Sequence, residues 1–439
     1  MAFRKEKTQG TEMKFYIETY GCQMNVADSE LIASILTKAG HQKVTQIGEA
    51  ELLLFNTCSV RSHAEERVLG RIQSEGHRKK DNPQLKIGVV GCMAQRLGKE
   101  LKRENQVVDF IIGVDQYKNL PEILQGNIAA TCLTDLDQTE VYRGILPSHQ
   151  SKYCAYITIM RGCNNFCSYC IVPYLRGRER SRPWQEIIQD TRTAGKQGRK
   201  DITLLGQNVN SYQDAEMNFP RLLAQLNCLE DIYRLRFITS HPKDLSDELI
   251  EVIAKSAKVC EHIHLPVQSG SDHILQEMNR NYTVQHYLNL VTKLRNAIPH
   301  IAITTDIMTG FPKETNEDFQ DTLSLMKEVE FDDAFCYKFS PRPGTLAADF
   351  KEQVSEPERL LRLQQMIELQ RTITLKKNKA LIGRTVEVYI EGYSKKSKDI
   401  VFGKTRDFKN AVLRGSEQDF GTLQKVEVKD ATASTLKCF

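Results

Sequence analysis

Three apolar runs of strand length occur in the first hundred residues, and each of them ends at a cysteine. They span residues 14–22, 51–58 and 86–92. An amphipathic stretch at residues 28–38 separates the first two runs, with Asp28 as a suitable N-cap. Strands that alternate with helices at this spacing form βαβ units and a parallel sheet. We therefore predict an N-terminal parallel-sheet α/β domain over residues 13–130.

Residues 153–375 repeat a strand followed by a helix six times. The predicted strands are residues 155–160, 201–205, 235–239, 262–265, 302–308 and 334–339. Repeats of roughly 30 residues or more fit βα units. Six units are too few for a closed eight-stranded barrel. The pattern therefore predicts a central partial (β/α)6 barrel.

The last segment, residues 376–439, alternates apolar and polar positions with period two, as in residues 385–393. This pattern predicts a small antiparallel β-barrel. The segment holds 14 Lys and Arg against eight Asp and Glu, whereas the whole chain has a formal charge of only +4. A positive module suggests contact with a phosphate backbone, although a solvated lysine-rich face is the alternative. The expected contacts are Lys404, Arg406, Lys409 and Arg414, beside Phe408.

The composition is that of an ordinary globular protein, with 439 residues, 40% hydrophobic and 26% charged. That length corresponds to about two or three domains. No run approaches the roughly 18 apolar residues of a membrane span, and the N-terminus lacks the apolar core of a signal peptide. We therefore expect a cytoplasmic protein without membrane contact. Its 12 cysteines are then expected to be metal ligands and buried thiols, not a disulfide framework.

Cys163, Cys167 and Cys170 lie within eight residues of one another. Thiolates at this spacing can bind one iron–sulfur cube, whose corners normally take four cysteines. With three local ligands, one iron stays open, as in a catalytic metal site. The alternatives are zinc, a disulfide or chance, but zinc prefers CxxC pairs and this segment offers no second pair.

Cys22, Cys58 and Cys92 each end a predicted parallel strand. Such sheets bind their ligands at the carboxyl edge, so the three thiols are expected to share a metal site. A second three-cysteine iron–sulfur cluster is the natural occupant, and zinc is the alternative. The other cysteines lack motif context and are interpreted as ordinary thiols: Cys132, Cys154, Cys228, Cys260, Cys336 and Cys438.

Polar and turn residues follow the predicted barrel strands, and together they outline a pocket. Gln207 and Asn208 after the second strand are candidate cofactor contacts. His241, His262 and His264 are interpreted as hydrogen-bonding or structural residues.

The sequence resembles the methylthiotransferases, which combine radical S-adenosylmethionine (SAM) chemistry with sulfur insertion. The spacing of Cys163, Cys167 and Cys170 matches the CxxxCxxC signature of radical SAM enzymes. Gln23-Met24-Asn25 favours the branch of the family that modifies N6-isopentenyladenosine in tRNA, and residues 376–439 resemble the family's RNA-binding TRAM domain. Further matching motifs lie at residues 20–25, 28–30, 56–61, 91–96 and 176–183.

The resemblance implies two 4Fe-4S clusters and SAM as cofactors. The Cys163/Cys167/Cys170 cluster would bind SAM and generate a radical, with Tyr169 beside the SAM adenine or packed on the barrel wall. The Cys22/Cys58/Cys92 cluster would present a sulfur, methylated by a second SAM, to C2 of N6-isopentenyladenosine on the 3′ side of the anticodon. Arg176, Arg178, Arg180 and Arg182 would grip phosphates of the tRNA anticodon stem-loop or the SAM carboxylate, with surface ion pairs as the alternative.

The target base must leave its helical stack to be reached. The resemblance further implies an external electron donor and a sulfur donor of unknown identity, and nothing in the sequence demands more than a monomer. Two rival functions stay open at this point. One is the same chemistry on a ribosomal protein side chain, and the other is a zinc-stabilised RNA-binding protein without catalysis.

Overall fold

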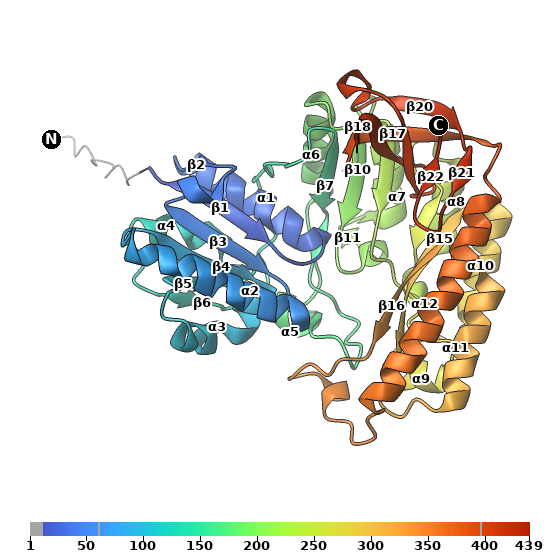
Figure 1. Cartoon of the computed structure of the whole chain (residues 1–439), viewed down its shortest axis with the longest axis horizontal. Helices are drawn as coiled ribbons and strands as arrows, with labels where there is room; N and C mark the ends of the chain where they lie inside the picture. The colour runs from blue at the N-terminus through green and yellow to red at the C-terminus, as the bar shows by residue number, and fades with distance from the viewer. Residues whose placement is uncertain (1–11, 60–61, 396) are drawn as a thin grey trace. The chain divides into compact units, whose positions relative to one another are not determined.

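The computed structural model describes residues 12–59, 62–395 and 397–439. The motif residues Val60 and Arg61 lie outside the described residues, as does the N-terminus up to residue 11. The chain divides into two compact units (Figure 1). The cysteine-edge unit comprises the chain up to residue 150 together with residues 171–180, and the barrel unit comprises residues 151–170 and 181–439.

The cysteine-edge unit is built on a parallel sheet with the strand order β2-β1-β3-β4-β5-β6, as predicted. Its strands are β1 (Lys14–Thr19), β2 (Gln42–Lys43), β3 (Leu52–Thr57), β4 (Lys86–Gly91), β5 (Phe110–Ile112) and β6 (Cys132–Leu133). Its helices are α1 (Gln23–Lys38), α2 (Ser62–Gly76), α3 (Cys92–Glu104), α4 (Leu120–Leu124) and α5 (Val172–Arg176). Residues of α1 and α4 pack in one core cluster and residues of α2 and α3 in another, so helices cover both faces of the sheet.

Helix α1 begins five residues earlier than predicted, and Asp28 is not its N-cap. Cys22 occupies the N-cap position with extended backbone, and its side chain makes no capping hydrogen bond. The sequence therefore carried no polar N-cap signal at the true start. Asp28 instead lies fully buried inside the helix. The consequence is that Cys22 sits directly at a helix N-terminus.

All six predicted strands of the barrel unit are confirmed. They are β7 (Cys154–Thr158), β10 (Asp201–Leu205), β13 (Arg234–Phe237), β14 (His262–His264), β15 (Ala302–Thr309) and β16 (Asp333–Lys338). They form two parallel sheets of three strands, β13-β10-β7 and β14-β15-β16. A parallel bridge between Leu235 and Val259 joins the two sheets. Six strands in chain order make the expected partial barrel.

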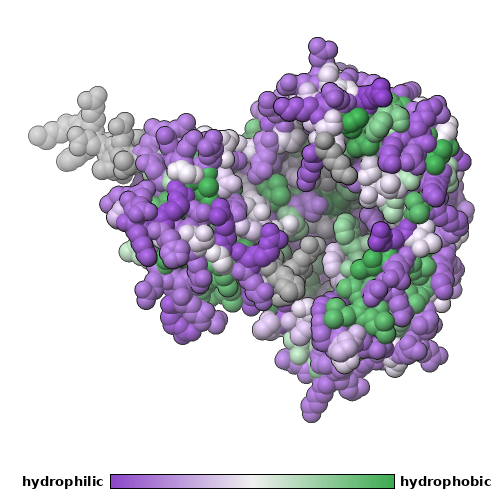
Figure 2. Space-filling model, in the orientation of Figure 1, coloured by the Kyte–Doolittle hydropathy of each residue, from purple (hydrophilic) through white to green (hydrophobic). Residues whose placement is uncertain are grey.

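The helices of the barrel unit follow its strands in the βα pattern. They are α6 (Trp184–Lys196), α7 (Phe219–Asn227), α8 (Asp247–Lys255), α9 (Asp272–Glu277), α10 (Val284–Ala297), α11 (Asn316–Val329) and α12 (Glu356–Lys379). Figure 2 shows an apolar patch over α12, where Leu360, Leu361 and Ile367 are exposed. No described helix combines the length and apolar composition that a bilayer span requires.

The C-terminal residues form the predicted small β-structure, a curled and mainly antiparallel sheet. Its strand order is β20-β17-β18-β19-β22-β21. The strands are β17 (Thr385–Ser394), β18 (Ser397–Thr405), β19 (Asn410–Arg414), β20 (Leu423–Glu427), β21 (Asp430–Ala431) and β22 (Leu436–Lys437). We call this element the C-terminal sheet.

Charged side chains of the C-terminal sheet dock it on the barrel strands. Arg406 pairs with Glu261 at 2.7 Å, and Lys409 pairs with Asp332 at 3.0 Å. Phe408 stacks on His262, with the ring centroids 4.8 Å apart, which gives His262 the structural role predicted for it. Arg406 and Lys409 are thus both engaged in ion pairs within the protein, and the expectation that they contact nucleic acid stays a prediction.

Candidate metal and cofactor sites

Cys22, Cys58 and Cys92 follow three neighbouring strands at their carboxyl ends. Cys58 and Cys92 come directly after β3 and β4, and Cys22 follows β1 by three residues. These strands are adjacent in the sheet, in the order β1-β3-β4. A Cβ built on Gly21 would lie 2.7 Å from the Cβ of Cys58, so the first two loops are in contact. The three thiols therefore belong to one edge, as the sequence predicted.

A buried amide network fixes the loops that carry these thiols. The Asn25 side chain donates to the Oδ1 of Asn56 at 3.1 Å and to the carbonyl of Thr57 at 3.2 Å. Asn56 in turn donates to the carbonyl of Asn25 at 2.7 Å and to the hydroxyl of Ser29 at 2.8 Å. These residues belong to the motifs around Cys22 and Cys58, so the network explains why amides occur beside those cysteines.

Arg176 of α5 lies against the third thiol. Its Nε is 3.3 Å from the Sγ of Cys92, and its Nη2 forms a 2.8 Å ion pair with Asp28. The side chains of Arg176 and Asp28 are both almost completely buried. Burial raises the pKa of the Cys92 thiol, the Arg176 guanidinium opposes that shift, and Cys22 adds to it. A thiolate at Cys92 would thus have a hydrogen-bond donor in place.

Cys163, Cys167 and Cys170 lie on the loop that follows β7 and the short strand β8 (Met160–Arg161). Cys163 and Cys167 are buried, and Cys170 is partly buried. The loop is anchored where α9 ends. The Ser168 amide donates to the carbonyl of Met278 at 3.0 Å, and the Asn279 side chain donates to the carbonyl of Phe166 at 2.9 Å.

A second arginine approaches this loop. The Nη1 of Arg280 is 3.6 Å from the Sγ of Cys167. Its Nη2 donates to the carbonyl of Pro266 at 2.6 Å, and its Nε donates to the hydroxyl of Tyr282 at 2.9 Å. Each of the two cysteine sets therefore has one buried guanidinium beside one of its thiols.

The predicted cofactor contacts lie at strand ends of the barrel unit. The Oε1 of Gln207 and the Oδ1 of Asn208 are buried acceptors without a hydrogen-bond partner among the described residues. Asn208 also donates to Asp244 at 2.7 Å, which fixes its side chain. The hydroxyl of Ser240, beyond the end of β13, is likewise buried and unpartnered within the described part of the chain. Buried polar groups normally have partners, so these atoms fit a ligand that donates hydrogen bonds.

Tyr169 lies between the last two cysteines of the loop. Its ring meets that of Phe311 edge-on, with the centroids 6.5 Å apart. Burial raises the pKa of the Tyr169 phenol well above its ordinary value, so the hydroxyl is neutral. This packing agrees with the barrel-wall role, and it leaves the contact with a SAM adenine a prediction.

Each donor set consists of three thiols, which is the ligand chemistry of an iron–sulfur cubane with one open iron. In the ranges that the structure describes, no three Cys, His, Asp or Glu side chains lie close enough to hold one metal ion. A cubane is larger than an ion and takes its thiolates from farther apart, and three thiols leave one iron open. Each cysteine set supplies three thiols and has an N–H donor beside one sulfur, and the two clusters themselves stay predictions.

The arginines after the cysteine loop depart from expectation. Arg180 pairs with Asp115 at 2.9 Å, and Arg182 pairs with Asp190 at 2.8 Å. Both are buried, as is Arg176, whereas Arg178 is exposed. The three buried arginines form ion pairs inside the fold and not on its surface, and the expected grip on phosphate or on the SAM carboxylate stays a prediction. Their charges are used within the fold.

Sequence reasoning missed the role of Arg280. It lies 113 residues from Cys167 in the chain, outside every motif that resembles the family. Its neighbours Asn279 and Tyr282 gave no signal either, because only the fold brings the end of α9 to the cysteine loop.

Two family models match the chain. Residues 157–326 match the Radical SAM superfamily, and residues 14–113 match the uncharacterized protein family UPF0004. A tRNA-2-methylthio-N(6)-dimethylallyladenosine synthase from Azobacteroides pseudotrichonymphae is 46% identical over 98% of both chains. The enzyme of that name from Thermoanaerobacter pseudethanolicus is 45% identical over 98% of this chain and 93% of its own length.

Among solved structures, the radical SAM methyltransferase TsrM from Kitasatospora setae aligns with a TM-score of 0.57 at 13% identity. The alignment covers 77% of each chain. At that identity the likeness concerns the fold alone. The extent and identity of the two full-length matches decide the family. The chain belongs to the radical SAM methylthiotransferase family.

Proposed function

We propose that this enzyme adds a methylthio group to C2 of N6-isopentenyladenosine, on the 3′ side of the tRNA anticodon. The proposal uses two 4Fe-4S clusters and two SAM molecules, one for radical generation and one as methyl donor. The observation that carries it is the pair of three-cysteine sets, each backed by a buried arginine. The names of the full-length relatives support the substrate.

The reaction needs cofactors because an adenine C–H bond has no leaving group and little acidity. When bound, the clusters and SAM supply the electron, the radical chemistry, the sulfur and the methyl group. The chain's own residues bind and orient them. Cys163, Cys167 and Cys170 would hold the SAM-binding cluster, and Cys22, Cys58 and Cys92 the second one.

The unpartnered acceptors of the barrel unit would orient SAM. The Oε1 of Gln207 and the Oδ1 of Asn208 can accept hydrogen bonds from its amino or hydroxyl groups. Tyr169, held against Phe311, would offer its ring to the SAM adenine. Because these groups are largely buried, they would also keep water from the reacting atoms.

Recognition of tRNA would combine a splayed base with contacts to phosphates. Arg384, Lys398, Arg414 and Lys425 of the C-terminal part are exposed and form no ion pair within the described residues. These cations, unlike Arg406 and Lys409, are available to a phosphate backbone. We propose tRNA as the partner, an external reductant as the electron donor, and the cytoplasm as the compartment.

The two cysteine sets can be tested separately on anaerobically reconstituted enzyme with isopentenylated tRNA. Cys167→Ala should abolish 5′-deoxyadenosine formation from SAM. Cys58→Ala should keep that reaction and lose methylthiolated nucleoside, as measured by mass spectrometry of digested tRNA. The control is Cys228→Ala, an exposed thiol outside both sets, which should change neither product.

Methylthiolation by Cys58→Ala at the normal rate would refute the sulfur-presenting role of the second set. Modification of a ribosomal protein in place of tRNA would move the enzyme to the other branch of its family. Zinc in place of iron and labile sulfide after reconstitution would refute the cluster assignment itself.

A further inference from the structure

Arg280 is a buried cation whose hydrogen-bond partners are all neutral. Its side chain touches a backbone carbonyl at Pro266, a phenol at Tyr282 and the thiol of Cys167. The residue is 7% exposed. In the part of the chain that the structure describes, none of the printed contacts of its guanidinium is with a carboxylate.

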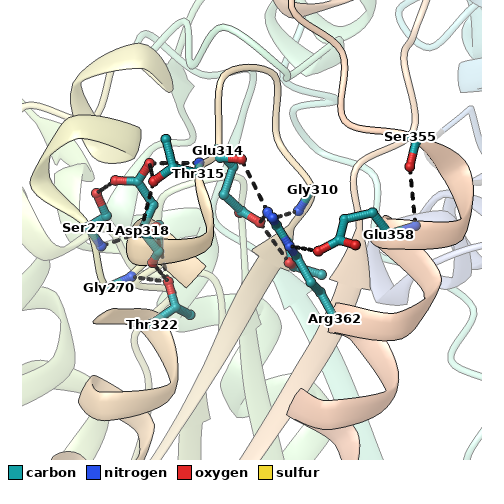
Figure 3. A network of polar contacts seen from close by, with 12 residues as sticks. Gly270, Ser271, Gly310, Glu314, Thr315, Asp318, Thr322, Ser355, Glu358 and Arg362 are labelled. Carbon is teal, nitrogen blue, oxygen red and sulfur yellow. Dashed lines mark hydrogen bonds and ion pairs between the residues drawn. The ribbon is translucent and has the colours of Figure 1, made fainter. Parts of the chain in front are cut away.

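Several other buried arginines of this protein are paired with carboxylates. Arg362, in the same unit, donates to Glu314 at 2.7 Å and to Glu358 at 2.9 Å (Figure 3). Arg176 pairs with Asp28 at 2.8 Å. An isolated charge in a protein interior is costly, so buried charges are normally paired. Within the described residues, Arg280 therefore lacks the carboxylate partner that Arg362 and Arg176 possess.

The missing counter-charge fits a cluster with thiolate ligands. Three thiolates on a cubane leave the group with a net negative charge, and reduction by one electron makes it more negative. The guanidinium is already aimed at one of the ligand sulfurs. Hydrogen bonds to sulfur and local charge set the reduction potential of such clusters.

We infer that Arg280 is a positioning residue, which donates an N–H to the Cys167 thiolate and raises the reduction potential of the cluster held there. This inference rests on the proposed function, because it needs that cluster. Its effect is to make the cluster easier to reduce by the external donor. Asp28 neutralises Arg176, so the charge contribution at the other cysteine set is smaller.

The test uses the full chain with Cys22, Cys58 and Cys92 replaced by alanine, so that one cluster remains. Arg280→Gln removes the charge, and Arg280→Lys keeps it. At a fixed solution potential, we expect Arg280→Gln to lower the ratio of reduced to oxidised cluster at least tenfold. This change corresponds to a fall of about 59 mV in the reduction potential of a one-electron couple. Arg280→Lys should retain most of the parent's potential. The readout is a potentiometric titration followed by electron paramagnetic resonance.

Arg362→Gln is the matched control, since it removes a buried arginine that already has carboxylate partners. It should destabilise the iron-free protein and leave the cluster potential unchanged. Arg280→Gln should not destabilise the iron-free protein to that extent, because it removes an uncompensated charge. If Arg280 were merely structural, Arg280→Gln would destabilise the iron-free protein as much as Arg362→Gln does and would leave the cluster potential unchanged.

Each result separates the alternatives. An unchanged potential in Arg280→Gln with full iron content overturns the inference. If Arg280→Gln folds without binding iron while Arg280→Lys binds it, the charge is required to hold the cluster, and the inference holds only where Arg280→Lys also keeps the parent's potential. If both variants lose iron and are as unstable as Arg362→Gln, the role is structural and the inference falls. A parent protein without iron would refute the proposed function, and the inference with it.

Discussion

At the scale of single residues, Gly21 controls how closely the first two cysteine loops approach. Its φ of +138° favours glycine, and an added Cβ would lie 2.7 Å from the Cβ of Cys58 and 2.8 Å from the Oδ1 of Asn25. Gly21→Ala should therefore displace the loops and cost the enzyme about half of its iron, while the Cys163 loop stays loaded.

Gly40 provides the matched control for this substitution. Its φ of +95° is also in the glycine-favoured region, but a Cβ there would meet nothing within 4 Å. Gly40→Ala thus introduces backbone strain without crowding. Iron analysis of both variants distinguishes the two effects, and equal iron contents would contradict the role of close approach at Gly21.

Arg176 and Asp28 form a buried ion pair. Replacing one of the two residues should lower the stability of the fold more than replacing both. Arg176→Gln removes the guanidinium that pairs with the buried Asp28 carboxylate, which costs about 3–5 kcal/mol. Adding Asp28→Asn should recover part of that loss, because the buried negative charge is then removed as well. The measurement is the free energy of unfolding of the three variants.

Arg178→Gln is the control for this cycle, because Arg178 is exposed and two residues away. It should change stability little. An Arg176→Gln variant as stable as the wild type would show that the pair contributes nothing to the fold.

At the scale of elements, strands were predictable and charged contacts were not. The runs that end at Cys22, Cys58 and Cys92 are local patterns, and the carboxyl-edge rule then brings the thiols together. The start of α1 was missed because a cysteine occupies its N-cap. The partners of Arg406 and Lys409 lie 145 and 77 residues away in the chain. No local pattern encodes such distant pairing.

Asp332 joins the C-terminal sheet to both the barrel and α12. It pairs with Lys377 at 2.7 Å and with Lys409 at 3.0 Å. Burial raises the pKa of its carboxyl, but the two lysines outweigh burial and hold that pKa below its ordinary value. Asp332→Asn leaves two partly buried ammonium groups unpaired and should cost about 3 kcal/mol of unfolding free energy.

The ion pairs of Asp332 with Lys377 and Lys409 predict how the stability of the fold depends on pH. Because the folded-state pKa of Asp332 is lowered, its stabilisation is present above the unfolded pKa and is lost as pH falls through the folded pKa. The wild type should therefore lose more stability than Asp332→Asn below about pH 4. Asp430→Asn, which removes an exposed pair with Lys437, serves as the control in thermal unfolding. Parallel stability curves for wild type and Asp332→Asn would contradict this assignment.

At the scale of the whole molecule, net charge indicated a nucleic-acid partner without locating the contact. The positive balance of residues 376–439 is real, but part of it neutralises carboxylates of the barrel. Lys398 and Arg414 are exposed, and they are the cations that we propose contact tRNA. Substituting both with glutamine should weaken tRNA binding and flatten its salt dependence by about 0.7–0.9 for each phosphate that is no longer neutralised.

Arg406→Gln is the comparison for this pair, since Arg406 is bound to Glu261. It should lower the unfolding temperature and leave the salt slope of tRNA binding unchanged. The slope is obtained from dissociation constants at several salt concentrations. If Arg406→Gln flattens the slope and the double variant does not, the RNA contact lies at the docking face.

Residues 171–180 belong to the cysteine-edge unit although they follow residues of the barrel unit in the chain, and this limits where the polypeptide can be divided. The chain passes between its two units after residues 150, 170 and 180. Ile171 and Leu175 pack with Cys92 in one small core cluster, and Arg176 neutralises Asp28. A fragment that stops at residue 150 would lack these contacts, including the guanidinium that pairs with Asp28. Chimeras of homologous enzymes that are joined at residue 150 should therefore fold poorly. They should fold when residues 171–180 come from the same parent enzyme as the cysteine-edge unit.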